Sequence, residues 1–170
     1  MTVASIVVSE GHEPPHGALD DFDFLIGDWA VANRRLKVRW TAEPRWDHFA
    51  ARQHCEAHLG HVANVDEIVF PEKGFAGMTV RLFDTRERRW SIYWINSRDG
   101  VLTPPVHGGF MGDRGEFYGV DLDDGAPVRV RFLWLKHAPH GGPRWEQAFS
   151  RDGRVWEINW VMELTHPTAS

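Results

Sequence analysis

The sequence predicts an all-β protein, a single antiparallel β-barrel of about ten strands with a short N-terminal helical turn. From residue 29 onward, turn signals rich in Gly, Asp and Pro separate short segments at regular intervals. Within these segments apolar and polar residues alternate, and the apolar positions hold many of the nine tryptophans of the chain. A sheet with one continuous apolar face can bury that face by closing around it, which favours a barrel.

Length and composition favour one domain and exclude several classes of partner. The chain has 170 residues, enough for a sizeable core, and a net charge of -5. Without a basic surplus or a Lys- and Arg-rich run, neither nucleic acid nor a membrane is expected as a partner. The single Cys55 cannot form an internal disulfide, and no convincing signal peptide or transmembrane run is present, so we expect a cytoplasmic protein. A homodimer stays open.

The chain is expected to have three parts. Residues 1–18 lack periodicity and are predicted to form a flexible N-terminal arm, residues 19–165 the barrel, and residues 166–170 a C-terminal tail. At the start of the barrel, "LDDFDFLIGDW" predicts one helical turn, which either Asp20 or Asp21 could cap.

The expected strands follow in order after this turn. A hairpin is predicted around Asp113 to Gly115, and another at the "RDG" of residues 151–153. The remaining turns are "DTRER", "SRDG" and "LDDG", and the loop is "HAPHGGP". The segments that these signals delimit are "GMTVRLFD", "RRWSIYWIN", "GGFMGDRGEFYGVD", "PVRVRFLWLK" and "RWEQAFSRDGRVWEINWVMEL".

A period of two assigns the faces of five segments. The opposite face carries Arg and Glu residues that we interpret as an external cross-strand ladder. A register error of one residue would exchange the faces and bring Tyr93, Tyr118 and Arg81 inside. The positions expected to face inward are Val128, Val130, Phe132 and Trp134; Trp145, Gln147 and Phe149; Trp156, Ile158, Trp160 and Met162; Trp90, Ile92, Trp94 and Asn96; and Met78, Val80 and Leu82.

The segment "RQHCEAHLGHVANVDE" is rich in histidine. On a helix, His54, His58 and His61 would share one face and resemble a metal site. Because the flanking segments are predicted strands, we predict a strand here too, with His54 and His58 outward and Gln53 and Cys55 inward. "HCEAH" matches neither order of the zinc-protease motif, and we predict no metal site.

"DFLIGDW" resembles the calycin signature, in which a Gly-x-Trp opens the first strand and the Trp plugs the closed end. Here these residues are Gly27, Asp28 and Trp29. With "NVDE", "RLFD", "WSIYW", "GEFYG", "RFLW", "RWEQAFS" and "WEINWVM", the text of about residues 20–164 is similar to a lipocalin-like bacterial family of unknown function. The resemblance implies a lipocalin-like barrel of ten strands and no known reaction. It carries no role over to the histidines before Asn64.

The inner face predicts a pocket for a small hydrophobic or aromatic molecule. A mostly apolar cavity with a few convergent polar groups is typical of small-molecule sites. The predicted ligand-binding residues are Gln53, Asn64, Trp90, Trp94, Asn96, His107, Trp134, Gln147, Trp156 and Trp160.

Two alternatives to a binding protein remain open. An enzyme such as a cyclase, isomerase or dehydratase could use Asp66 or Tyr93 to move a proton, because a carboxyl among tryptophans has a raised pKa. In a plainer interpretation Asp66 binds buried backbone or indole N–H groups. Haem or metal binding through His107 or the histidine cluster is the other alternative, but no cofactor is predicted. No phosphate-binding, dinucleotide-binding or serine-hydrolase motif is present.

Overall fold

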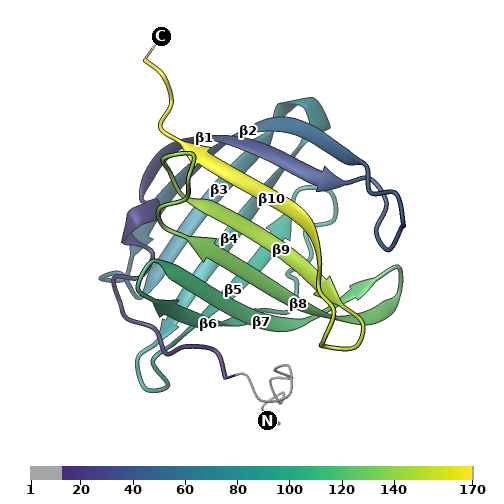
Figure 1. Ribbon diagram of the computed structural model, residues 1–170. Helices are drawn as coiled ribbons and strands as arrows, with labels where there is room; N and C mark the ends of the chain where they lie inside the picture. Colours follow the sequence, from purple (N-terminus) through teal and green to yellow (C-terminus); the bar gives the residue numbers. More distant parts are fainter. Residues whose placement is uncertain (1–12, 170) are drawn as a thin grey trace.

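The protein is a closed antiparallel barrel of ten strands in a computed structural model that describes residues 13–169 (Figure 1). The predicted all-β class and barrel are confirmed. Two short 3-10 turns accompany the strands, η1 (Asp23–Leu25) and η2 (Pro71–Lys73). The strands are β1 (Gly27–Leu36), β2 (Trp46–His58), β3 (Ala63–Phe70), β4 (Phe75–Asp84), β5 (Arg89–Asn96), β6 (Val106–Met111), β7 (Arg114–Asp123), β8 (Ala126–Leu135), β9 (Arg144–Ser150) and β10 (Glu157–Thr165).

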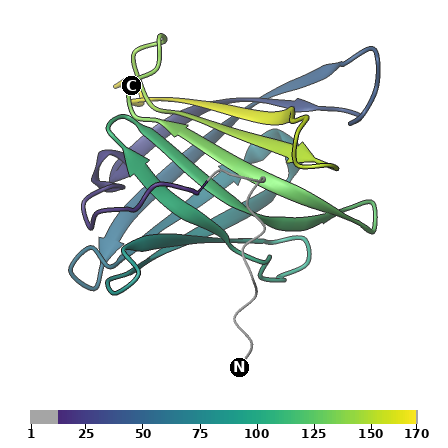
Figure 2. The ribbon, with the colours of Figure 1, turned by 60° about the horizontal axis from the view of Figure 1, so that its bottom comes forward.

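Each strand pairs with its neighbours in sequence, and β1 closes the barrel against β10 (Figure 2). The weakest seam is between β5 and β6, which share three residue pairs, from Trp90 to Ile92 on β5. Beyond that seam the loop of residues 97–105 takes the place of a strand. The Thr103 N–H donates to the carbonyl oxygen of Trp94 at 2.8 Å. The barrel wall is therefore least continuous near the end of β5.

One end of the barrel is closed by the segment that precedes β1. Phe22 is 1% exposed, and its ring lies 5.0 Å from Trp90 and 5.3 Å from Phe110 between ring centroids. Trp29 is buried at this end and donates its indole N–H to the Leu25 carbonyl oxygen at 2.7 Å. Trp29 therefore packs against the turn that closes this end of the barrel.

The predicted helical turn is present as η1, but the predicted aspartate cap is wrong. Phe22 occupies the N-cap position, and no side chain caps the turn. The Asp21 carboxylate instead accepts the Ala18 N–H at 2.8 Å and the Trp90 indole N–H at 3.2 Å. A buried aspartate that receives two donors holds the chain before η1 against the barrel.

The predicted faces hold for β5, β8 and β9 and fail for β4. Met78 and Leu82 are 38% and 39% exposed, whereas Arg81 is 3% exposed and Phe83 7%. The apolar side chains on the outer face of β4 misled the prediction, because a partly exposed apolar residue costs little while an unpaired buried arginine costs much. Arg81 has a buried partner, described below, that makes its inward position stable.

The predicted face of β10 is wrong at its start. The register between β9 and β10 shifts between Ile158 and Trp160, which marks a β-bulge. As a result Asn159 is 2% exposed while Ile158 is 37% exposed. Trp156 precedes the strand and packs outside, with its ring 6.0 Å from that of Tyr118. The alternation predicted from Trp156 to Met162 therefore holds only from Trp160 onward.

Part of the predicted N-terminal arm is packed. Residues 1–12 lie outside the described residues. Gly17 donates its N–H to the Arg88 carbonyl oxygen at 2.7 Å, and a Cβ at Gly17 would approach the Trp90 ring to 2.8 Å. Glycine thus permits this close approach. At the C-terminal side, the His166 ring stacks on Trp29 at 4.4 Å. No helix in residues 13–169 has the length and apolarity needed to cross a membrane.

Candidate functional site

A cavity with an empty volume of about 830 Å³, part of it open to solvent, lies inside the barrel. All strands except β1 contribute lining residues. Its exposed margin is formed by Pro104 and Val120, so the cavity opens beside the 97–105 loop and the end of β7. The opening coincides with the short seam between β5 and β6.

Four tryptophans stand among the apolar residues of the cavity wall: Trp94, Trp134, Trp145 and Trp160. Trp160 contacts Trp145 edge-on at 5.7 Å and Trp94 at 6.4 Å between ring centroids. The indole of Trp94 lies flat over Gly77, where a Cβ would fall 1.9 Å from the ring. Glycine at this point of β4 lets Trp94 cross the barrel interior toward Trp160.

A buried polar cluster stands in the same cavity. Arg81 on β4 and Asp66 on β3 both line it, with Arg81 Nη2 2.5 Å from Asp66 Oδ2. Arg81 Nη1 also donates to Asn64 Oδ1 at 2.8 Å, and the Cys55 thiol approaches the same oxygen at 3.2 Å. Side-chain exposure is 4% for Arg81 and 2% for Asp66. The pair is thus removed from bulk water except through the cavity.

Burial controls the protonation of this cluster. It raises the pKa of the Asp66 carboxyl, while the Arg81 guanidinium opposes the rise. Burial also raises the pKa of the Cys55 thiol to about 11, so this cysteine is no nucleophile at neutral pH. Asp66 and Arg81 can offer a ligand one acceptor and one donor side by side. Arg81 Nε has no hydrogen-bond partner among the described residues.

Two amides add to the polar lining, which also includes Thr79, Thr103 and Asp121. Gln53 is 6% exposed, lines the cavity, and its side-chain nitrogen has no partner among residues 13–169. Gln147 lines the opposite wall and donates to Asn159 Oδ1 at 2.8 Å. The bulge in β10 turns Asn159 inward to accept this bond. An unpartnered buried amide at a cavity wall is available to a ligand.

Six of the predicted site residues share this cavity: Gln53, Asp66, Trp94, Trp134, Gln147 and Trp160. Two others lie inside the barrel but outside the lining. Asn64 supports Arg81 from behind, and Trp90, which is 0% exposed, packs in the closed end. Asn96 lies at the end of β5 and accepts the Arg98 N–H at 2.9 Å.

The remaining predicted residues lie on the outer face. Tyr93 alternates with the cavity-lining Trp94, so it does not share a space with Asp66. His107 pairs with Ser91 across β5 and β6, its Nδ1 2.8 Å from the serine hydroxyl. Burial lowers the pKa of His107. Trp156 is outside as well, as described above.

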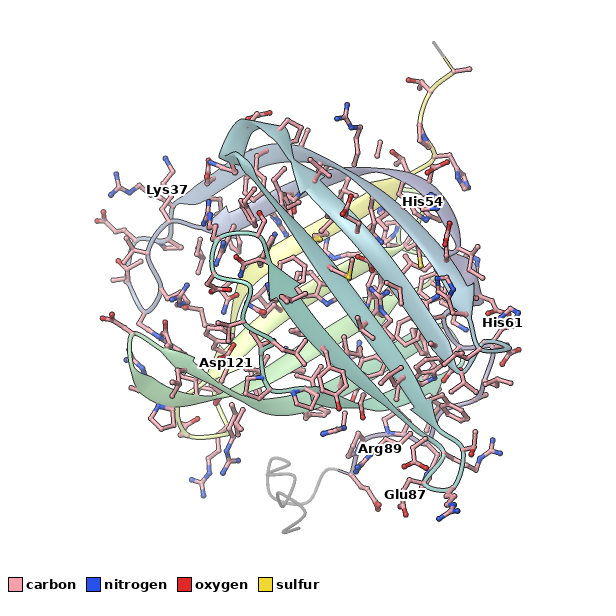
Figure 3. The ribbon with its side chains drawn as sticks, turned by 180° about the vertical axis from the view of Figure 1, so that it is seen from behind. Lys37, His54, His61, Glu87, Arg89 and Asp121 are labelled. Atoms are coloured by element: carbon pink, nitrogen blue, oxygen red, sulfur yellow. The ribbon has the colours of Figure 1, made fainter. Side chains whose placement is uncertain are left out.

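The histidine cluster contacts carboxylates on the outer surface, and the predicted strand is confirmed for β2, which ends at His58. His54 Nδ1 lies 2.6 Å from Asp28 Oδ1, and its Nε2 lies 2.9 Å from Glu56 Oε1. His58 Nε2 is 3.4 Å from the other oxygen of Glu56, whereas His61 pairs with Asp23 at 2.7 Å. Figure 3 shows His54 and His61 at the surface of the molecule. No group of three or more His, Cys, Asp or Glu residues in the described chain has the geometry for a metal ion.

Arg81 and Thr79 line the cavity but were not among the predicted ligand contacts. The sequence did indicate this inward face of β4, because Phe83 and Gly77 alternate with the outer residues and lie on the same face as Arg81 and Thr79. The exposed apolar residues of the other face outweighed it. The hydrogen bond between Gln147 and Asn159 at the β10 bulge could not be predicted from the sequence. An extra residue in a strand leaves the composition of the strand unchanged.

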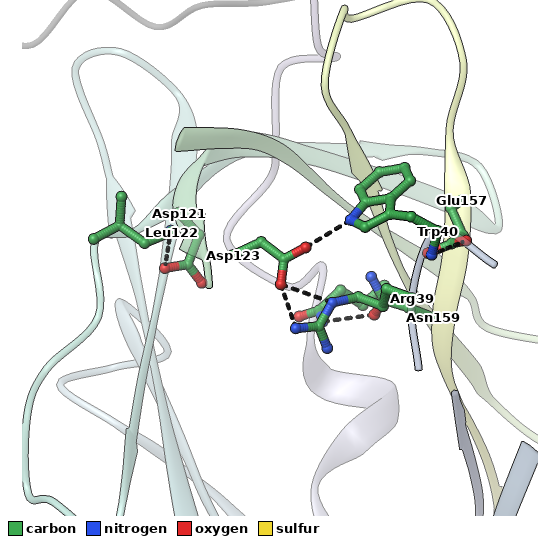
Figure 4. Close-up of polar contacts among 8 residues, drawn as sticks. Arg39, Trp40, Asp121, Leu122, Asp123, Glu157 and Asn159 are labelled. Atoms are coloured by element: carbon green, nitrogen blue, oxygen red, sulfur yellow. Dashed lines mark hydrogen bonds and ion pairs between the residues drawn. The ribbon is translucent and has the colours of Figure 1, made fainter. Parts of the chain in front are cut away.

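A second polar cluster joins loops at the open end of the barrel (Figure 4). Arg39 and Trp40, from the β1–β2 loop, both bind Asp123 at the end of β7. The Trp40 indole N–H lies 2.7 Å from Asp123 Oδ2, and its backbone N–H donates to Glu157 at 2.8 Å. Trp40 has a φ of 61°, a left-handed backbone that a bulky residue adopts only when contacts hold it. These bonds tie the β1–β2 loop to β7 and β10.

Comparison with known proteins adds no relative. The sequence matches no protein-family model, and no curated protein matches it. The fold and the cavity therefore carry the functional argument.

Proposed function

We propose that the barrel binds a small hydrophobic or aromatic molecule in this cavity. The observation that carries the proposal is the combination of four tryptophans with the buried pair Asp66 and Arg81 in one space. Aromatic rings offer large apolar contact to the body of a ligand. The carboxylate and guanidinium offer an acceptor and a donor to its polar edge. The ligand expected from this lining is flat and mostly apolar, with oxygen or nitrogen atoms along one edge.

We also propose that the chain is a lipocalin-like member of the calycin superfamily. The support is the Gly-x-Trp at the start of β1, with Trp29 buried at the closed end of a ten-strand barrel. A cytoplasmic location belongs to the same proposal, since the buried Cys55 is a free thiol.

Native mass spectrometry of the freshly purified protein, beside its denatured mass, tests the binding function first. An adduct of a few hundred daltons that is lost on denaturation would support the proposal and give the ligand mass. A haem or metal mass would overturn it in favour of histidine ligation. For a protein without adduct, the fluorescent probe N-phenylnaphthylamine tests the cavity directly.

A matched pair of variants on β4 locates the probe. Thr79 lines the cavity, whereas Met78, its neighbour, is 38% exposed on the outer face. Thr79→Phe fills the cavity and should weaken probe binding by roughly tenfold or more, about 1.4 kcal/mol. Met78→Phe adds a similar ring outside and should leave binding unchanged. Equal effects of both variants, or none, would overturn binding inside the barrel.

A proton-transfer enzyme is the second candidate, because Asp66 faces the cavity and burial raises its pKa. In such an enzyme the barrel would hold a hydrophobic metabolite in a reactive shape while Asp66 moves a proton. Asp66→Asn should then abolish turnover while probe affinity survives in the folded variant. Unchanged turnover would remove Asp66 from the mechanism.

A further inference from the structure

Arg35 is a cation without a partner at the open end of the barrel. It lies on the inner face of β1, partly buried, with its guanidinium carbon 4.4 Å from the ring centroid of Trp160. No ion pair or hydrogen bond joins its side chain to any described residue. Its cross-strand neighbour Asp47 is bound to Lys73 instead.

Two other carboxylates of this end are bound by other groups, and a third, Asp121 of the cavity lining, accepts the Leu122 N–H at 2.7 Å. Asp123 binds Arg39 and Trp40, and Glu157 accepts the backbone N–H of Trp40. The charges that act on Arg35 are those of Arg39 and Arg98, both positive. Together with burial they lower the pKa of Arg35, which still leaves a guanidinium protonated at neutral pH. Among the described residues, no carboxylate is thus paired with Arg35.

Arg98 stands on the same layer of aromatic rings. Its guanidinium carbon lies 4.0 Å from the centroid of Phe75. Phe75 stacks on Phe70 at 4.6 Å, and Phe70 contacts Trp160 at 5.9 Å. Two guanidinium groups therefore rest on one continuous aromatic layer, and Trp160 at its far side lines the cavity. Such groups on rings remain free to bind a carboxylate, sulfonate or phosphate.

We propose, on the basis of the binding function above, that the ligand is an amphipathic anion. Its apolar body lies in the cavity against Trp160, and its anionic group binds Arg35 at the open end, with Arg98 as the second cation. Within the cavity the Arg81 guanidinium already has Asp66 as its partner, so this pair contributes little selection for charge. Selection for an anion therefore falls to Arg35.

Two probes with the same ring system test this proposal. Anilinonaphthalene sulfonate carries an anionic group that N-phenylnaphthylamine lacks. Arg35→Gln should weaken binding of the sulfonate by roughly tenfold or more, as for a lost charge-assisted pair, and leave the neutral probe within about twofold. Arg35→Lys should keep most of the sulfonate affinity. Arg45→Gln is the control, because it removes one exposed charge from the β1–β2 loop.

The outcomes separate this inference from the binding function. Suppose that Thr79→Phe weakens binding of the neutral probe but Arg35→Gln does not change the affinity for the sulfonate. This result would support binding in the cavity and overturn the anion site. Equal losses of both probes in Arg35→Gln would also overturn it, because Arg35 would then act by supporting Trp160. Binding of neither probe to the unmodified protein would overturn the cavity function itself, and the anion site with it.

Discussion

The wall formed by β2, β3 and β4 carries an acid–base pairing on each side, and the two sides differ in exposure. Inside, Asp66 and Arg81 are 2% and 4% exposed. Outside, on the neighbouring part of β2, His54 and Glu56 are 54% and 58% exposed. Cys55 lies between these two outer residues in the sequence and is buried on the inner side. Alternation along one strand thus separates two electrostatic environments by a single residue.

This difference in exposure determines how strongly a charged side chain affects the stability of the fold. Inside, desolvation makes each charge costly unless its partner is present, so the pair is stable only as a pair. Outside, water solvates every member, and ion pairs between exposed side chains contribute little. Changes to the inner pair should therefore have large effects, and changes to the outer one small effects that depend on pH.

The largest effect is expected when the inner pair is broken. Asp66→Asn leaves the Arg81 guanidinium buried without a carboxylate, and we expect a loss of about 3–5 kcal/mol in the free energy of unfolding. Urea denaturation at neutral pH measures it. Thr79→Val, which removes a hydroxyl next to Asp66 but no charge, is a control with a smaller expected loss.

Replacing both charges sharpens the same comparison. Asp66→Leu with Arg81→Met removes the desolvation cost together with the attraction, so the double variant should be more stable than Asp66→Asn. If the double variant is as unstable as Asp66→Asn, the loss in the free energy of unfolding does not come from the broken ion pair. It would then come from the support that these side chains give to Asn64 and Cys55.

The same two sides show what the sequence could predict. Strand alternation on β2 correctly predicted Gln53 and Cys55 inward and His54 outward, because the inner face of that strand is mostly small or apolar. On β4 the same rule failed, since Arg81 is buried by its partner on β3 and pairing between distant residues leaves no local pattern. The bulge near Asn159 was equally invisible. The fold followed from turns and alternation, whereas the site depended on tertiary pairings.

A smaller effect is expected at Cys55, which tests burial of the inner side without a mutation. With a pKa of about 11, the thiol has little thiolate at pH 8, and alkylation by iodoacetamide should be about a hundredfold slower than in the urea-unfolded chain. Mass spectrometry of the alkylated protein over time gives both rates. Similar rates in the folded and unfolded chain would show that the inner side is open to solvent.

The smallest effect is expected at His54 on the outer side. Two hydrogen bonds raise the pKa of His54 above its ordinary value of 6.5. The bond to Glu56 is the larger cause, and the bond to Asp28 is the second. A raised pKa in the folded state means that the contribution to stability is complete below the unfolded pKa and is lost as the pH rises through the folded pKa. The protein should therefore lose a little stability from about pH 6.5 upward, and less at high salt.

Imidazole titration by NMR measures this directly. Glu56→Gln should lower the pKa of His54 more than Asp28→Asn, because the bond to Glu56 is the larger cause. His54→Gln should flatten the pH dependence of the urea midpoint. If neither carboxylate variant changes the pKa of His54, the outer pairing is absent in solution. The contrast between the two sides would then rest on the inner pair alone.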